Sequence, residues 1–274
     1  MTPRTVGGDL IQYLSGVVHM EESILLGYLV LTISFAVFQL CFSVVSPRLS
    51  SALSHSYQAL PRKKHLEWDS RCVSTIHATI ISFFSLYILQ YDDAINANKL
   101  RGDPKLVRLI VAIASGYLLY DLLLLLRFWS FLGDGMFLCH HVISLFSFQY
   151  QLITGALPYF ANFRLLCEFS TPFVNFRWFL DVAGWPRSSP IVFLNGLAMA
   201  VVFFIARIAV IPTYYHHMLA WVGTEAMAQL SLPLKSTWVL SSLGLEILNI
   251  YWMYRILRGL LHAFRSLQSS HRKD

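Results

Sequence analysis

The segment Met136–Trp178 reads MFLCHHVISLFSFQYQLITGALPYFANFRLLCEFSTPFVNFRW, and it sets two adjacent histidines, a glutamate and two arginines in an apolar background. A charged side chain at the bilayer centre costs about 2.5–3.5 kcal/mol on insertion scales, so such groups are expected to have a function or to pair with one another. The segment therefore indicates a membrane-embedded helical protein with polar groups in its interior.

The composition of the whole chain supports this interpretation. Apolar residues make up 56% of its 274 residues and charged residues 13%, whereas a soluble domain has about 25% charged residues. The net charge of +6 comes mainly from basic residues at the edges of apolar runs, where they suit lipid headgroups. We therefore expect no nucleic-acid partner. The N-terminus lacks the pattern of a cleaved signal peptide, and the four cysteines are expected to be buried, reduced thiols.

Apolar runs of about 20 residues are long enough to cross the hydrocarbon core of a bilayer. The runs that we interpret in this way are residues 23–46, 72–91, 106–126, 135–156, 157–180, 190–214 and 233–254. Gly155 and Pro158 predict a tight turn between the fourth and fifth runs. The expected fold class is all-α: a multi-pass membrane bundle of about seven transmembrane helices.

Basic residues in short loops predict the orientation of such a bundle. Loop 48–71 and the C-terminal tail are both rich in Lys and Arg. Six predicted spans separate these two segments, so they lie on the same side of the membrane, which we expect to be the cytosol. The N-terminus is then lumenal or external, and the C-terminus is cytosolic.

Polar side chains lie at a similar depth in six of the predicted spans, when depth is counted from the cytosolic ends at about 1.5 Å per residue. They are His77, Asp121, His140, His141, Asn175, Asn195 and Asn249. Each polar group needs a partner in lipid, so we predict a polar cavity that opens toward the cytosol. The side chains expected to line it are His77, Ser144, Arg164, Glu168, Thr171, Asn175, Asn195, Glu246 and Asn249.

Several of these residues also have a purely structural interpretation. Arg164 and Glu168 are spaced to pair within one helix, and Arg207 with Glu246 is a second expected ion pair. Asn195 and Asn249 can hold helices together by hydrogen bonds. His77 is equally consistent with a buried histidine whose nitrogens are satisfied by neighbours.

The pair His140 and His141, together with Asp121, is different because two adjacent imidazoles in a membrane offer no packing advantage over apolar residues. A neutral imidazole can act as a general base or as a nucleophile, and a carboxylate can orient it and stabilise its protonated form. These three residues are the candidate catalytic group. We expect no metal site, because the histidines do not have the HxxxH and HxxHH spacing of di-iron hydroxylases and desaturases.

Four motifs resemble the TLC domain, which translocon-associated membrane proteins and ceramide synthases share. They are Arg71-x2-Ser74-x2-His77, SGYLLYD ending at Asp121, CHH at 139–141, and NFRLLCEFSTPFVNFRWF from Asn162. The resemblance covers roughly 65–262 and implies one N-terminal helix followed by a six-helix TLC core. It divides the chain into residues 1–64 (tail, first helix and basic loop), 65–262 (TLC domain) and 263–274 (basic tail).

The resemblance also implies a function. Ceramide synthases transfer a fatty acyl group from acyl-CoA to the amine of a sphingoid base and require the paired histidines, which His140 and His141 match. This chain has Cys167-Glu168-Phe169-Ser170-Thr171 where those enzymes carry a His-Asp-x-x-Asp run. Two functions therefore stay open: an acyl-CoA-dependent lipid N-acyltransferase, or a non-catalytic protein that binds, moves or senses lipids and regulates membrane composition.

The remaining expectations follow from the family. The location is the endoplasmic reticulum or another endomembrane, and the role is in lipid homeostasis. No bound cofactor is expected, and fatty acyl-CoA would be a co-substrate. The expected partners are membrane lipids, with a sphingoid base or another acyl acceptor for an enzyme, and a homo-oligomer is a further option.

Overall fold

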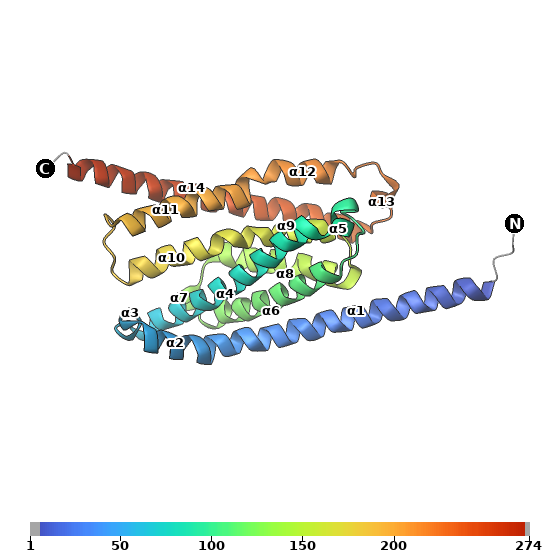
Figure 1. Ribbon diagram of the computed structural model, residues 1–274, viewed down its shortest axis with the longest axis horizontal. Coiled ribbons are helices and arrows are strands. Elements are labelled where there is room, and N and C mark those ends of the chain that lie inside the picture. Colours follow the sequence, from blue (N-terminus) through green and yellow to red (C-terminus); the bar gives the residue numbers. More distant parts are fainter. Residues whose placement is uncertain (1–5, 272–274) are drawn as a thin grey trace.

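The computed structural model describes the backbone of residues 6–271 and the side chains of residue 18 and of residues 20–261, and within this part of the chain it contains helices and no strands (Figure 1). The all-α class is confirmed. The side chains of the predicted basic tail, 263–274, lie outside the described residues.

The helices follow one another in seven long stretches. These are α1 (Val6–Leu40) with η1 (Cys41–Val45) and α2 (Ser46–Leu53); α4 (Arg62–Tyr91); α6 (Lys105–Arg127); α8 (Gly135–Thr154); α9 (Pro158–Leu165) with η2 (Leu166–Ser170) and α10 (Thr171–Val182); α11 (Pro190–Phe203) with η3 (Phe204–Ala209) and α12 (Ile211–Leu219); and α14 (Leu232–His271). Short helices in the connections are α3 (His55–Gln58), α5 (Asp93–Ala97), α7 (Trp129–Leu132) and α13 (Glu225–Ala228).

Five of the predicted apolar runs lie within one of these stretches, and the runs 135–156 and 157–180 extend one or two residues into the turn between α8 and α9. The seven stretches are not equally apolar. Among the described residues, four helices are long and apolar enough to cross a membrane: Met20–Leu53, Arg62–Tyr91, Lys105–Arg127 and Pro190–Leu219. The stretches built on α8, on α9 and α10, and on α14 carry ionisable interior residues such as His141, Glu168 and Glu246. The protein is therefore an all-helical chain with several candidate membrane spans, and seven crossings stay a prediction.

Three of the long stretches are interrupted, and a proline follows each interruption. The π-helical segments η1 and η3 precede Pro47 and Pro212, and the 3₁₀ segment η2 precedes Pro172. Proline has no N–H and its ring clashes with the carbonyl four residues earlier. That carbonyl belongs to Ser43, Glu168 or Ile208, which lies inside the irregular segment in each case. The prolines thus explain where the regular α-helical pattern breaks.

Helix α6 is central, because it packs against both α1 and α8. Its contact with α1 depends on Gly116, where an added Cβ would lie 2.5 Å from the carbonyl oxygen of Leu31 and 2.7 Å from Cβ of Ser34. Small residues allow membrane helices to approach closely. The absence of a side chain at Gly116 therefore sets how closely the first helix lies against the rest of the bundle.

The connection between α8 and α9 is the predicted tight turn, and it is confirmed. Gly155 adopts a left-handed conformation with φ of +63°, and its N–H donates to the carbonyl of Gln151. Leu157 is also left-handed, with φ of +60°, and its N–H donates to the carbonyl of Leu100. Glycine tolerates this conformation without steric cost, so the two helices reverse direction within a few residues.

A hydrogen-bonded cluster attaches the connection after the first helix to α4. Asp69 is buried and accepts hydrogen bonds from Ser46 Oγ at 2.6 Å and from Tyr57 Oη at 3.0 Å. Burial raises the pKa of Tyr57, and its hydrogen bond to the carboxylate of Asp69 raises it further. Tyr57 therefore stays a proton donor, and α2 and α3 are held against α4.

The four cysteines are unpaired, but they are not all buried. Cys167 lies in the interior, whereas Cys139 is exposed on the outer side of α8. The expectation of four buried thiols is thus wrong for Cys139, because the turn that places its neighbour His140 on the cavity wall points Cys139 outward.

Candidate functional site

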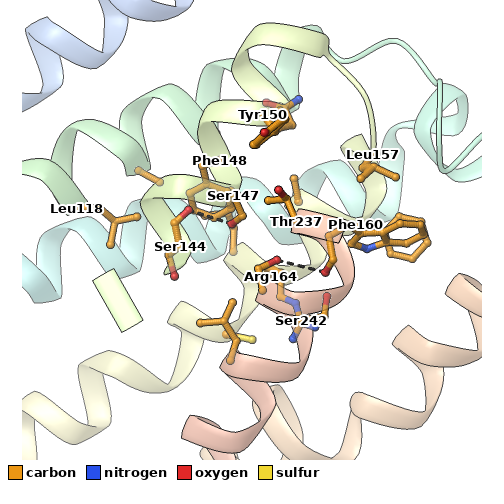
Figure 2. A pocket seen from close by; sticks show the side chains of 18 of the residues that line it. Leu118, Ser144, Ser147, Phe148, Tyr150, Leu157, Phe160, Arg164, Thr237 and Ser242 are labelled. Atoms are coloured by element: carbon orange, nitrogen blue, oxygen red, sulfur yellow. Dashed lines mark hydrogen bonds between the residues drawn. The ribbon is translucent and has the colours of Figure 1, made fainter. Parts of the chain in front are cut away.

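A narrow cavity of about 80 Å³ lies inside the bundle, and Figure 2 shows side chains that line it. Its walls come from α4, α6, α8, α9, η2, η3, α12 and α14. Apolar side chains such as Leu118, Phe148, Leu157 and Phe160 form much of the lining. The polar lining residues include His77, His140, Ser144, Ser147, Gln151, Arg164, Glu168, Arg207 and Asn249.

The structure places the predicted residues in two groups. His77, His140, Ser144, Arg164, Glu168 and Asn249 line the cavity. Asp121, His141, Thr171, Asn175, Asn195 and Glu246 are not among its lining residues, but most of them hold a lining residue or a neighbouring helix in place. The side of the membrane toward which the cavity opens stays a prediction.

His141 is fixed by two acceptors. Its Nε2 lies 2.9 Å from Oδ2 of Asp121 on α6, and its Nδ1 lies 2.8 Å from the carbonyl oxygen of Phe137. Both partners are oxygen acceptors, so both ring nitrogens donate only when the ring is protonated. Ser70 Oγ donates to the other oxygen of Asp121 at 3.3 Å. His141 and Asp121 thus form a buried pair that connects α8 to α6.

His140 differs from its neighbour in orientation. Consecutive residues on an α-helix point about 100° apart, and His140 lines the cavity whereas His141 does not. The two ring planes are nearly perpendicular, with centroids 5.6 Å apart. Nδ1 of His140 is buried and has no hydrogen-bond partner among the described residues. Of the paired histidines, His140 is therefore the one that a molecule in the cavity can contact.

His77 is buried without the partners that a structural histidine normally has. Its ring stacks on Tyr117 with centroids 3.7 Å apart and planes 11° apart. Neither of its ring nitrogens has a hydrogen-bond partner in the part of the chain that the structure describes. A buried polar group without a partner costs about 1–3 kcal/mol, so the interpretation of His77 as a hydrogen-bonded structural residue does not match its surroundings.

The ion pairs in the interior differ from those expected. Arg164 Nη1 lies 2.7 Å from Oε1 of Glu246 on α14, and its guanidinium stacks over the ring of Tyr214. Glu168 instead accepts a hydrogen bond from Thr171 Oγ1 at 2.9 Å. The predicted pairs Arg164–Glu168 and Arg207–Glu246 are therefore wrong. Pairing at i, i+4 requires a continuous α-helix, and the 3₁₀ segment η2 starts between Arg164 and Glu168.

Arg207 makes only neutral hydrogen bonds among the described residues. It donates to Ser170 Oγ at 2.9 Å, to Asn249 Oδ1 at 3.2 Å and to Thr171 Oγ1 at 3.5 Å. It lies in the π-helical segment η3, a kind of irregularity that is frequent at functional sites. Because Thr171 also donates to Glu168, it connects this cation to a carboxylate. Arg207 thus has no direct carboxylate partner among the described residues, and Thr171 bridges it to Glu168.

The two predicted asparagines outside the lining join helices. Asn175 Nδ2 donates to Thr75 Oγ1 at 3.0 Å, and its Oδ1 accepts from Arg71 Nη1 at 3.1 Å. Asn195 Nδ2 donates to the carbonyl of Phe173 at 3.2 Å. Their positions agree with the structural interpretation, in which polar side chains hold membrane helices together.

Gln151 is a lining residue that the sequence reasoning missed. It is 3% exposed, and neither Nε2 nor Oε1 has a hydrogen-bond partner in the described structure. A signal was present in the sequence: Gln151 follows His140, Ser144 and Ser147 at i+11, which returns to the same helical face. The polar stripe on α8 is therefore longer than predicted, and it extends to the turn at Gly155.

Comparison with known proteins supports the resemblance seen in the motifs. The family model described as the TLC domain matches residues 67–258. The chain is 53% identical over 240 residues to TLC domain-containing protein 4 of Xenopus tropicalis, covering 88% of this chain and 93% of that protein. It is 52% identical to TLC domain-containing protein 4-B of Danio rerio over 82% of this chain and 86% of that one. The human TLC domain-containing protein 4 is 40% identical over 88% of this chain and 92% of its own length. The chain belongs to the TLC domain family.

Proposed function

We propose that this protein handles lipids by holding one lipid chain in the cavity, with the polar group of the lipid near His140. The observation that carries the proposal is the cavity itself, whose lining combines apolar side chains with polar ones such as His140, His77 and Glu168. A single-chain lipid has the same division into a long apolar part and a small polar part. The unpartnered nitrogens of His77 and His140 would receive their hydrogen bonds from that polar group.

The charge distribution favours a lipid group that is neutral where it meets the protein. Arg164 is paired with Glu246, and His141 with Asp121. Arg207 is connected to Glu168 through Thr171. Burying an additional charge without a partner is costly, so an ester, thioester, amide or hydroxyl group, or an amine in its uncharged form, suits this interior better than a free carboxylate.

A second candidate function, transfer of an acyl group, is favoured by the arrangement of Asp121, His141 and His140. In this reaction His140 takes a proton from the amine of the acceptor lipid, and the amine nitrogen attacks the thioester carbonyl of fatty acyl-CoA. The C–N bond forms while the C–S bond breaks, and the leaving thiolate takes the proton from His140. Asp121 acts through His141, because the carboxylate contacts that ring and not the cavity.

The proposal also includes the topology and location expected from the sequence and the family. The beginning of α1 and the end of α14 lie at opposite ends of the long axis of the bundle (Figure 1), an arrangement that supports an odd number of crossings. We propose seven crossings, a cytosolic C-terminus and residence in the endoplasmic reticulum or another endomembrane.

The decisive experiment uses the full-length protein in lipid nanodiscs. Lipids that co-purify with the protein are identified by mass spectrometry, and labelled fatty acyl-CoA is offered with a panel of amine and hydroxyl lipids. The variants are His140→Ala, Ser147→Phe, which fills the cavity, and His55→Ala as a control on an exposed histidine.

Each outcome selects one function. Product formation by the wild type that is lost in His140→Ala establishes the acyltransferase. A co-purifying single-chain lipid that is lost in Ser147→Phe, without turnover by any form of the protein, establishes the non-catalytic lipid-binding protein. If no lipid is retained and no product forms, although His55→Ala and the wild type are folded, lipid handling by this cavity is refuted.

A further inference from the structure

The structure assigns Gln151 a role in recognition. We propose that the bound lipid chain carries a hydroxyl group at its far end, about 16 Å from the group held at His140, and that the amide of Gln151 binds this hydroxyl. The inference rests on the proposed function, because it concerns the chain that the cavity holds. It adds the class of lipid: a chain with hydrogen-bonding groups at both ends.

The position of Gln151 gives the length of the ligand. Gln151 is 11 residues after His140 on α8. At about 1.5 Å per residue, the two side chains start about 16 Å apart along the helix axis, and 11 residues bring them to the same face. Ser144 and Ser147 lie between them on that face, and all four residues line the cavity. The ligand therefore has one polar contact at each end of this wall.

The missing hydrogen-bond partners of the Gln151 amide indicate that this side chain binds a ligand. Both of its polar atoms are buried and unpartnered among the described residues, although each would normally be satisfied. Other polar groups on the α12 and α14 walls of the lining already have partners. Trp238 Nε1 donates to Tyr214 Oη at 2.9 Å, and Tyr214 Oη is 2.9 Å from Ser242 Oγ. A glutamine without such partners destabilises the empty bundle. A leucine or methionine at position 151 would fill the space equally well without that cost.

A hydroxyl group is the best chemical match. The glutamine side chain has an N–H donor and a carbonyl acceptor, and a hydroxyl both donates and accepts. A carboxylate at this end would bring a buried negative charge, and both guanidinium groups of the lining already have partners: Arg164 pairs with Glu246, and Arg207 donates to Ser170 and Asn249. A plain methyl end would leave the amide of Gln151 unsatisfied.

The test compares two classes of probe and two matched variants. Long-chain alkanols and α,ω-alkanediols of about ten to eighteen carbons bracket the distance of ~16 Å. Their binding to the protein in nanodiscs is measured by competition against a fluorescent single-chain lipid. Gln151→Met removes the amide while keeping the shape, and Gln149→Met makes the same change at a partly exposed position on α8 outside the lining. Each probe is compared between protein variants in the same nanodiscs, so its partition into the bilayer is the same in both measurements.

We expect Gln151→Met to weaken binding of the matching diol about tenfold and to leave the alkanol unchanged or tighter, because only the diol loses a hydrogen bond. Gln149→Met should change neither. The thermal stability of Gln151→Met should equal or exceed that of the wild type, which excludes unfolding as the cause. If the wild type binds the alkanol but Gln151→Met does not affect the diol, this inference is overturned while lipid binding stands. If neither probe binds the wild type, the proposed function fails with it.

Discussion

Replacing Glu246 with leucine tests the ion pair in the interior. The pair joins α9 to α14 through a contact of 2.7 Å, and its side chains are only 13% (Arg164) and 8% (Glu246) exposed. Removal of one member of a buried pair leaves an uncompensated charge and costs about 3–5 kcal/mol, whereas replacing both members by apolar residues is often neutral or stabilising. We therefore expect a large loss of stability in Glu246→Leu and its recovery in the double variant with Arg164→Met.

The expected change is large enough to measure in detergent. A free-energy change of 1 kcal/mol shifts the melting temperature by about 2–4 °C for a chain of this size class, so the single substitution should lower it by about 6–20 °C. Thermal unfolding is followed by the loss of monodisperse protein on size-exclusion chromatography. Glu168→Leu is the matched control, because Glu168 accepts one hydrogen bond from a hydroxyl group and has no arginine within 4.0 Å among the described residues.

The control distinguishes two accounts of the interior. If the arginine at position 164 depended on Glu168, as the spacing alone predicts, Glu168→Leu would be the more damaging change. The reasoning is refuted if Glu168→Leu destabilises the protein as much as Glu246→Leu, or if the double variant is no more stable than Glu246→Leu alone.

Three further predictions concern other contacts. Gly116→Ala places a methyl group 2.5 Å from a backbone oxygen of α1, so we expect a loss of about 1–3 kcal/mol and faster proteolysis of the first helix. Tyr57→Phe removes the hydrogen bond to Asp69 and should cost about 1–3 kcal/mol near pH 7. Because burial raises the pKa of Tyr57, this advantage of the wild type should shrink above about pH 10, where tyrosine ionises in the unfolded chain; melting curves at several pH values test the sign. His77→Phe keeps the stacking on Tyr117 and removes two unpartnered nitrogens, so the melting temperature should rise while lipid retention falls, and a fall in melting temperature would contradict this.

Much of the fold could be predicted because its signals are local. Apolar runs locate the long helical stretches, and Gly155 marks the turn after α8. The sequence also indicates where the helices become irregular, since Pro47, Pro172 and Pro212 each follow an irregular segment. A proline specifies that the regular pattern breaks, but it does not specify whether the backbone tightens into a 3₁₀ turn or widens into a π turn. That choice depends on packing against the neighbouring helices.

The same choice decides which side chains meet. The distance in sequence from Arg164 to Glu168 indicates a pair only if the helix is regular, and the 3₁₀ segment rotates Glu168 toward Thr171 instead. The helix on which each polar residue lies was therefore predictable from the apolar runs, whereas its partner was not. Gln151 was missed for a related reason, because an uncharged residue in an apolar run gives a weak signal until its face is known.

The paired histidines lie at the same level of α8 but face different neighbours, so they have different roles. Both lie at nearly one level of α8, so the sequence presents them as equivalent. The turn of about 100° between consecutive residues directs His141 onto Asp121 and leaves His140 on the cavity wall. A substitution of His141 should therefore act by releasing Asp121, a buried carboxylate whose remaining hydrogen-bond donor among the described residues is Ser70 at 3.3 Å. It should lower stability together with function, whereas His140→Ala should reduce lipid retention or turnover with little change in melting temperature.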